Sequence, residues 1–101
     1  MATFVEALEV EKLPAGKSTT VTLEGKNIAL YNVEGAVYAT SDACAHAGSS
    51  LGWGILEGAF VKCRAHGLRF DVRTGRVAGS ADVGVASYPT KVENGKIYVE
   101  I

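Results

Sequence analysis

The sequence has little of what defines several large classes of protein. Lys and Arg number ten against eleven Asp and Glu, which leaves a net charge of −1 and no basic run, so we expect no nucleic-acid partner. No stretch approaches the roughly 20 apolar residues that a membrane-spanning helix needs. The first twelve residues contain three glutamates and no cationic start followed by an apolar segment. We therefore expect no signal peptide, no membrane contact and a cytoplasmic location.

Length and composition leave room for one folded unit. The 101 residues match the size of a single domain, and 48% apolar against 21% charged residues is the balance of a globular protein. We therefore expect residues 1–101 to form a single domain, with a monomer as the default state.

Helical periodicity is also missing, and short β-rich runs separated by glycine turns take its place. Two-residue hairpin turns need positive φ, which predicts such turns at Glu34-Gly35, Glu57-Gly58, Thr74-Gly75 and Asn94-Gly95. Eight strands at this spacing predict an all-β fold, an antiparallel sandwich or partly open barrel. They are expected at residues 4–8, 19–23, 28–33, 37–40, 60–63, 69–72, 91–93 and 96–101.

One long segment, residues 41 to 56, has no strand character. Loops of more than about 12 residues in a compact domain are usually functional or disordered. Trp53, the only tryptophan, lies in this segment. It either packs between the loop and the sheet, shields a bound group or contacts a partner.

Cysteine and histidine are scarce, with two of each. All four lie in two short motifs, Cys44-Ala45-His46 and Cys63-Arg64-Ala65-His66. A lone cysteine pair in a cytosolic chain more often forms a metal or redox site than a disulfide. Thiolate and imidazole are strong ligands for soft and borderline metals. The pattern therefore predicts a four-ligand metal centre.

Two metal groups suit such a ligand set. The first is a tetrahedral structural zinc, and the second is a [2Fe–2S] cluster in which two histidines replace two cysteines. Zinc fingers place two cysteines on one loop and two histidines on a helix, whereas each motif here supplies one of each. The mixed arrangement favours the cluster, and a structural zinc-binding module stays open as an alternative from a different class.

The extended motifs Cys44-Ala45-His46-Ala47-Gly48 and Cys63-Arg64-Ala65-His66-Gly67 resemble the C-x-H and C-x-x-H motifs of the Rieske family. The resemblance continues through residues 69–75 and 88–99. It implies a Rieske-type antiparallel fold with a small cluster-binding subdomain of two loops, at about 42–56 and 63–70. It also implies one [2Fe–2S] cluster, with one iron bound by Cys44 and Cys63 and the other by His46 and His66.

The resemblance also carries an expectation about reduction potential. High-potential Rieske proteins have a loop disulfide, and a serine and a tyrosine that donate hydroxyl hydrogen bonds. Here Ser49 and Ala65 occupy the disulfide positions, and Leu68 and Phe70 occupy the hydroxyl positions. This implies a value near the low end of the Rieske range of about −150 to +300 mV.

An exposed cluster without a substrate domain implies an electron carrier and not an enzyme. The resemblance to soluble Rieske ferredoxins implies transfer of one electron at a time from a flavin-containing ferredoxin reductase to the terminal oxygenase of an aromatic-ring dioxygenase system. Docking to both partners would be weak and transient. The alternative within the family is a small Rieske-like subunit of a nitrite reductase or another redox complex.

Overall fold

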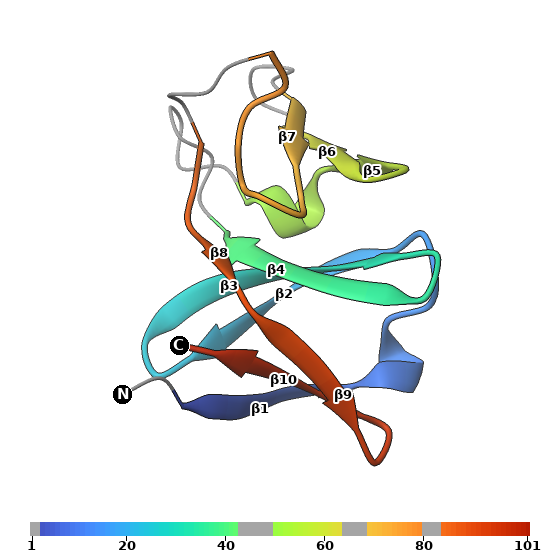
Figure 1. The fold of residues 1–101 in the computed structure, drawn as a ribbon, viewed down its shortest axis with the longest axis vertical. Helices are drawn as coiled ribbons and strands as arrows, with labels where there is room; N and C mark the ends of the chain where they lie inside the picture. Colours follow the sequence, from blue (N-terminus) through green and yellow to red (C-terminus); the bar gives the residue numbers. More distant parts are fainter. Residues whose placement is uncertain (1–2, 43–49, 64–68, 80–83) are drawn as a thin grey trace.

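The computed structural model describes residues 3–42, 50–63, 69–79 and 84–101. These residues form ten strands and two short 3-10 helices, and none of them lies in an α-helix (Figure 1). The elements are β1 (Phe4–Glu9), η1 (Val10–Lys12), β2 (Ser18–Leu23), β3 (Lys26–Val33), β4 (Ala36–Ser41), η2 (Leu51–Trp53), β5 (Ile55–Glu57), β6 (Phe60–Lys62), β7 (Arg69–Asp71), β8 (Ser87–Tyr88), β9 (Thr90–Glu93) and β10 (Lys96–Glu100). In the described part of the chain no helix has the length and apolar character to cross a membrane.

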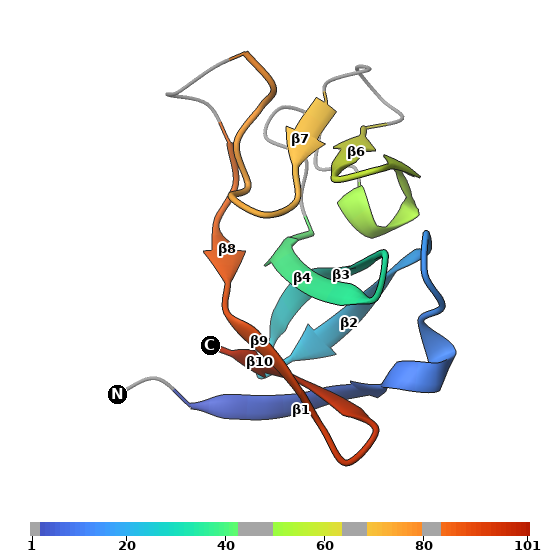
Figure 2. The same cartoon turned by 45° about the vertical axis from the view of Figure 1, so that its right-hand side comes forward.

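The strands form three antiparallel sheets with the orders β1-β10-β9, β2-β3-β4-β8 and β5-β6-β7. Figures 1 and 2 show the first two sheets as a base and the third sheet standing at one end above β4 and η2. Pro89 alone separates β8 from β9, so the chain passes from the second sheet to the first there. The all-β antiparallel prediction is confirmed, and the sheets do not close into a barrel.

Three two-residue hairpin turns have positive φ at both central residues, the backbone of a type I′ turn. Glu34-Gly35 and Asn94-Gly95 were expected, and both are present with φ of 52° and 95°, and 52° and 75°. The third, Glu24-Gly25, joins β2 to β3 and was not predicted. Its glycine fits the same rule as the other two.

Two turn predictions are wrong in detail. Glu57 pairs with Phe60 at the end of β5, so the turn is Gly58-Ala59 and not Glu57-Gly58. Thr74-Gly75 is the second half of a four-residue turn, since the Asp71 amide donates to the Arg76 carbonyl at 2.7 Å. In both places glycine has positive φ, but the strand register decides where the turn begins.

Two strands were missed, and both are short. β5 overlaps the end of the segment expected to be a loop, and β8 has only two residues. Such short segments show no alternation that a sequence pattern can reveal. As a result the first expected loop, 42–56, ends in η2 and β5, and the second, 63–70, ends in β7.

The core has two parts that share β3. Ile28 and Leu30 point to a cluster between the two base sheets, together with Ile97 and Val99 of β10. Ala29 and Tyr31 point the other way, to a second cluster that also holds Leu51, Val61, Cys63, Phe70 and Val72. A strand that is buried on both faces reads as a continuous apolar run, as residues 28–31 do. The third sheet is therefore mounted on the base through the second cluster.

Candidate metal centre

Of the four predicted ligands, the structure describes only Cys63. Cys44, His46 and His66 lie outside the described residues. Cys63 directly follows β6 and has no exposed surface. Its neighbours in the second core cluster include Leu51, in the described part of the first predicted loop, and Phe70, the last residue of the second. The described ends of both loops therefore share one apolar core.

The base of the first loop is fastened by Asp42, a residue that the sequence analysis did not single out. Asp42 follows β4, is 6% exposed, and its Oδ1 atom accepts three hydrogen bonds. The donors are Thr20 Oγ1 of β2 at 2.8 Å, Ser50 Oγ at 2.9 Å and the Gly52 amide at 2.9 Å. Because Asp42 and Ser50 flank residues 43–49, this acceptor ties together the two ends of the first ligand loop. We name the group Asp42, Thr20, Ser50 and Gly52 the Asp42 clamp.

Backbone contacts complete the Asp42 clamp. The Leu51 amide donates to the Asp42 carbonyl at 2.6 Å, and the Asp42 amide donates to the Asn27 carbonyl at 3.1 Å. A Cβ atom at Gly52 would overlap Thr20 Oγ1 and would lie 2.7 Å from the Thr19 carbonyl oxygen. Only glycine therefore lets η2 approach β2 this closely. No local sequence pattern indicated this arrangement, because its contacts join residues that are far apart in the chain.

The second loop starts and ends on the β6–β7 pair. Val61 lies opposite Phe70, and Lys62 lies opposite Arg69. This strand pairing fixes the position of the backbone directly before Cys63. Phe70 is fully buried beside Cys63 in the second core cluster and carries no hydroxyl group. The resemblance assigns hydroxyl donors to positions 68 and 70, and the structure describes only position 70. Phe70 supplies no such donor there.

Asp71 and Arg73 brace the turn that follows β7. Arg73 donates Nε and Nη2 to the two oxygens of Asp71 at 3.0 and 2.9 Å, and the Arg73 amide donates to Oδ1 at 2.9 Å. These hydrogen bonds hold the pKa of the Asp71 carboxyl below its ordinary value. The turn is fixed beside β7, where Phe70 and Val77 form a bridge.

The donor set and its surroundings fit an iron–sulfur cluster. A thiol without exposed surface in an apolar environment suits a cluster sulfur ligand, because the surrounding shell controls solvent access and potential. Within the described ranges, no other group of three or more His, Cys, Asp and Glu side chains could hold a metal ion. The described residues thus offer no competing centre.

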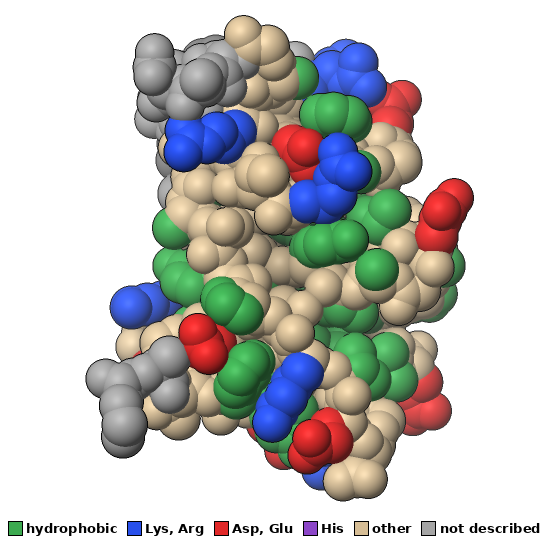
Figure 3. All heavy atoms as spheres, viewed as in Figure 1, with side chains coloured by type: hydrophobic (Ala, Val, Ile, Leu, Met, Phe, Trp, Pro, Cys, Tyr) green, Lys and Arg blue, Asp and Glu red, His purple; other side chains and the backbone are tan. Residues whose placement is uncertain are grey.

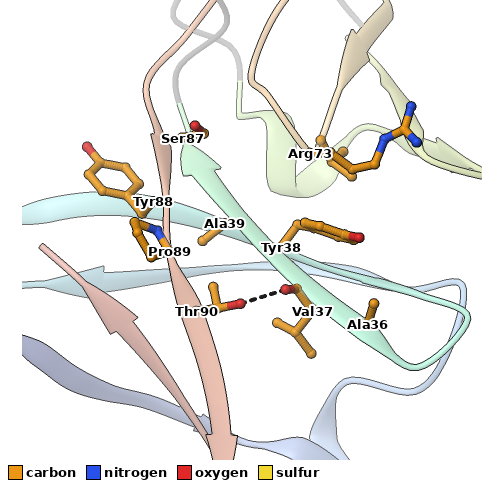
Figure 4. A pocket seen from close by; sticks show the side chains of 10 residues that line it. Ala36, Val37, Tyr38, Ala39, Arg73, Ser87, Tyr88, Pro89 and Thr90 are labelled. Carbon is orange, nitrogen blue, oxygen red and sulfur yellow. Dashed lines mark hydrogen bonds between the residues drawn. The ribbon is translucent and has the colours of Figure 1, made fainter.

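One groove has none of the predicted ligands among its described lining residues. It has a volume of about 570 Å³ and lies where β4, β8 and β9 meet the turn after β7 (Figure 4). Tyr38, Arg73 and Tyr88 are among its lining residues, and Thr90 Oγ1 donates to the Val37 carbonyl at 2.6 Å across it. Its one cation, Arg73, is already paired with Asp71. Among its described lining residues, the groove therefore has no charged side chain that is free to bind an organic ligand.

Trp53 is not packed between the loop and the sheet. Its side chain is 72% exposed at the end of η2. The interpretation as a buried packing residue is therefore wrong. The remaining interpretations, shielding a bound group and contacting a partner, both agree with this exposure.

Comparison with known proteins connects this geometry to a family. The Rieske [2Fe-2S] domain matches residues 3–89, a range that includes all four predicted ligands. The ferredoxin component of the naphthalene 1,2-dioxygenase system of Pseudomonas aeruginosa is 36% identical over 99 residues, which cover 97% of this chain and 95% of that protein.

Solved structures share the fold over nearly the full length. The complex of reduced oxygenase and oxidized ferredoxin in carbazole 1,9a-dioxygenase matches with a TM-score of 0.86 and 32% identity, over 95% of this chain and 91% of that chain. A putative NADH-dependent nitrite reductase small subunit from Mycobacterium tuberculosis matches with a TM-score of 0.90 and 23% identity, over 100% of this chain and 96% of that chain. At that identity the second likeness concerns the fold alone.

Proposed function

Because this chain belongs to the Rieske [2Fe-2S] domain family, we propose that it carries one electron at a time from a flavin-containing reductase to a terminal oxygenase. The observation that carries the proposal is the likeness, over 97% of the chain, to the ferredoxin component of a naphthalene dioxygenase system. The chain holds one Rieske-type [2Fe–2S] cluster and acts as an electron-transfer component, not as an enzyme in its own right.

We assign the cluster ligands as Cys44 and Cys63 on one iron and His46 and His66 on the other. When bound, the cluster supplies one-electron redox chemistry at a potential raised by its two histidine ligands. The role of the chain is to hold these ligands and to limit solvent access. Burial of Cys63 and the Asp42 clamp at the base of the first loop support this assignment.

The finer features of the role are part of the same proposal. We take residues 1–101 as a single Rieske domain that works as a monomer in the cytoplasm and docks transiently with each partner. A Rieske ferredoxin has been seen in complex with its oxygenase in the carbazole 1,9a-dioxygenase system. The dioxygenase relatives favour aromatic compounds as the substrates of the wider system.

A small subunit of a nitrite reductase is the second candidate. The fold match to such a subunit supports it, but the identity of 23% carries no function. The four intact ligand residues of this chain favour the ferredoxin role, because an electron carrier cannot work without its cluster.

A coupled assay tests the proposal. Purified protein is mixed with NADH and with the reductase and oxygenase components of the naphthalene 1,2-dioxygenase system, and oxidation of naphthalene is followed. We expect product only when this chain is present, and none with Cys63→Ser, which removes one ligand. The ferredoxin of that system serves as the positive control. A protein that takes up one electron but gives no product would contradict the dioxygenase role.

A further inference from the structure

The outer face of the β5-β6-β7 sheet presents two rows of side chains, one of Glu57, Phe60 and Asp71 and one that lies beside the second ligand loop. Leu56, Val61 and Phe70 point inward, and the two last are fully buried in the second core cluster. The adjacent residues Ile55, Lys62 and Arg69 lie opposite one another in register and point outward. Lys62 and Arg69 are the last and first strand residues before and after the loop. The row therefore borders the ligand loop directly.

This row puts two cations opposite each other. Like charges in directly opposed positions of an antiparallel pair destabilise a sheet. In the described part of the chain, neither Lys62 nor Arg69 forms an ion pair. Asp71, the nearest acidic residue along β7, is held by Arg73 at 2.9 Å. The Arg69 guanidinium lies over the Phe60 ring, 5.5 Å from its centroid, which fixes its position without neutralising its charge.

The charge of the whole chain is distributed unevenly. Residues 42–82 hold five Lys and Arg against four Asp and Glu, whereas the rest of the chain holds five against seven. Figure 3 shows Lys and Arg side chains with Asp and Glu side chains beside them at the end that carries β5–β7, and side chains of both charges at the base. The ligand-loop stretch is therefore slightly positive and the rest slightly negative, and the local cationic feature is the opposed pair Lys62 and Arg69.

Apolar surface lies beside the two cations. Ile55 is 42% exposed in the same row, and Trp53, two residues earlier, is 72% exposed. Aromatic residues and arginine are enriched where protein surfaces bind one another. Exposed apolar groups next to unneutralised cations suit a protein surface with carboxylates around an apolar centre.

We propose that Trp53, Ile55, Lys62 and Arg69 form the docking face for a protein redox partner whose contact surface is acidic. The inference rests on the proposed function, because it places this face beside the electron-carrying centre. The cations speed the encounter through long-range attraction, and the apolar residues supply close contact. Directly opposed cations disfavour the strand pairing that carries them, and the docking face gives them a role.

Small charged oxidants test the electrostatic part without a partner. The reduced protein is oxidised by ferricyanide, an anion, or by hexaammineruthenium(III), a cation, in a stopped-flow instrument. We expect Lys62→Glu/Arg69→Glu to slow the reaction with ferricyanide about tenfold at about 10 mM ionic strength and to speed the reaction with the cation. Both effects should vanish near 1 M, where the Debye length is about 3 Å.

The matched control is Lys12→Glu/Lys26→Glu, which makes the same change of charge at two exposed positions of the base. It should leave both rates within about twofold of the unchanged protein, since neither residue belongs to the β5-β6-β7 sheet that carries the proposed docking face. In the coupled assay, Trp53→Ala/Ile55→Ala should lower the rate at limiting protein concentration about fivefold and leave the rate at saturation unchanged.

The outcomes separate the two proposals. A protein without a reducible cluster would overturn the proposed function. A reducible protein whose two double charge variants respond alike to both oxidants would overturn the docking face alone. A normal rate in the coupled assay for Trp53→Ala/Ile55→Ala would exclude these two side chains from the contact.

Discussion

Phe70 is the residue through which the potential is most directly tested. It is fully buried in the same core cluster as Cys63, at a position where high-potential Rieske proteins are expected to carry a hydroxyl donor. A hydroxyl that bonds to the cluster stabilises the more negative, reduced form. A hydrogen bond worth about 1 kcal/mol corresponds to a rise of roughly 40 mV for a one-electron couple. We therefore expect Phe70→Tyr to raise the potential by about that amount, measured by protein-film voltammetry.

Tyr31→Phe is the control for this substitution. Tyr31 belongs to the same core cluster, and its hydroxyl lies 2.9 Å from Thr40 Oγ1. Burial raises the pKa of Tyr31, so its hydroxyl stays protonated over the pH range of the voltammetry. Its removal should lower stability by about 1 kcal/mol and leave the potential unchanged. Equal potentials for Phe70→Tyr and Tyr31→Phe would show that a hydroxyl at residue 70 does not reach the cluster.

At the residue scale, the sequence indicated the candidate cluster ligands but not the residues that hold the ligand loops in place. Two scarce residue types gathered in two motifs predict the four ligands, and the one that the structure describes, Cys63, is buried in an apolar cluster. Asp42 could not be recognised as a support, because its three donors come from β2, from Ser50 and from Gly52. Contacts between residues 22 positions apart, such as Asp42 and Thr20, leave no local pattern.

The packing of η2 on β2 is the element-scale feature that we expect to matter most for the first ligand loop. A Cβ atom at Gly52 would approach the Thr19 carbonyl oxygen to 2.7 Å and overlap Thr20, which donates to Asp42. Gly52→Ala should therefore separate η2 from β2 and lower stability by about 2–3 kcal/mol. We also expect a lower iron content per protein, measured together with thermal unfolding at a fixed scan rate.

Gly25→Ala separates this steric effect from a general effect of replacing glycine. Gly25 has φ of +80° and no heavy atom within 4 Å of a built Cβ. We expect Gly25→Ala to lower the free energy of unfolding by about 1 kcal/mol through backbone strain and to leave the iron content unchanged. If Gly25→Ala lost as much iron as Gly52→Ala, the Asp42 clamp would not be the cause.

Element prediction succeeded where strands were long and failed where they were short. All eight predicted strands are present within two residues of their expected ends. β5 and β8 contain three and two residues and owe their conformation to β6 and to β4. Their pairing is a tertiary contact, so local sequence could not indicate it.

The whole molecule has a base with its own core and a smaller sheet whose strands β6 and β7 flank the second ligand loop. The strands of the β5-β6-β7 sheet have only three residues each, which is marginal for independent stability. Removal of the cluster with an iron chelator should therefore loosen this sheet first. We expect hydrogen exchange at Val61 and Phe70 to speed up about 100-fold, while exchange at Leu30 and Val99 of the base stays within about threefold.

The loaded protein under the same buffer conditions is the reference for this exchange experiment. Unchanged protection at Val61 and Phe70 would mean that the second core cluster, and not the bound cluster, holds the small sheet in place. Equal loss of protection in β3 and β10 would mean that the two halves unfold as one unit.

The ligand set itself is the central claim, and electron paramagnetic resonance of the dithionite-reduced protein tests it most directly. Two histidines on one iron predict a rhombic signal whose average g value lies clearly below that of an all-cysteine [2Fe–2S] cluster. His66→Cys should move the average toward the all-cysteine value if the cluster is retained. A signal of the all-cysteine kind in the unchanged protein, or a colourless protein with stoichiometric zinc, would contradict the account.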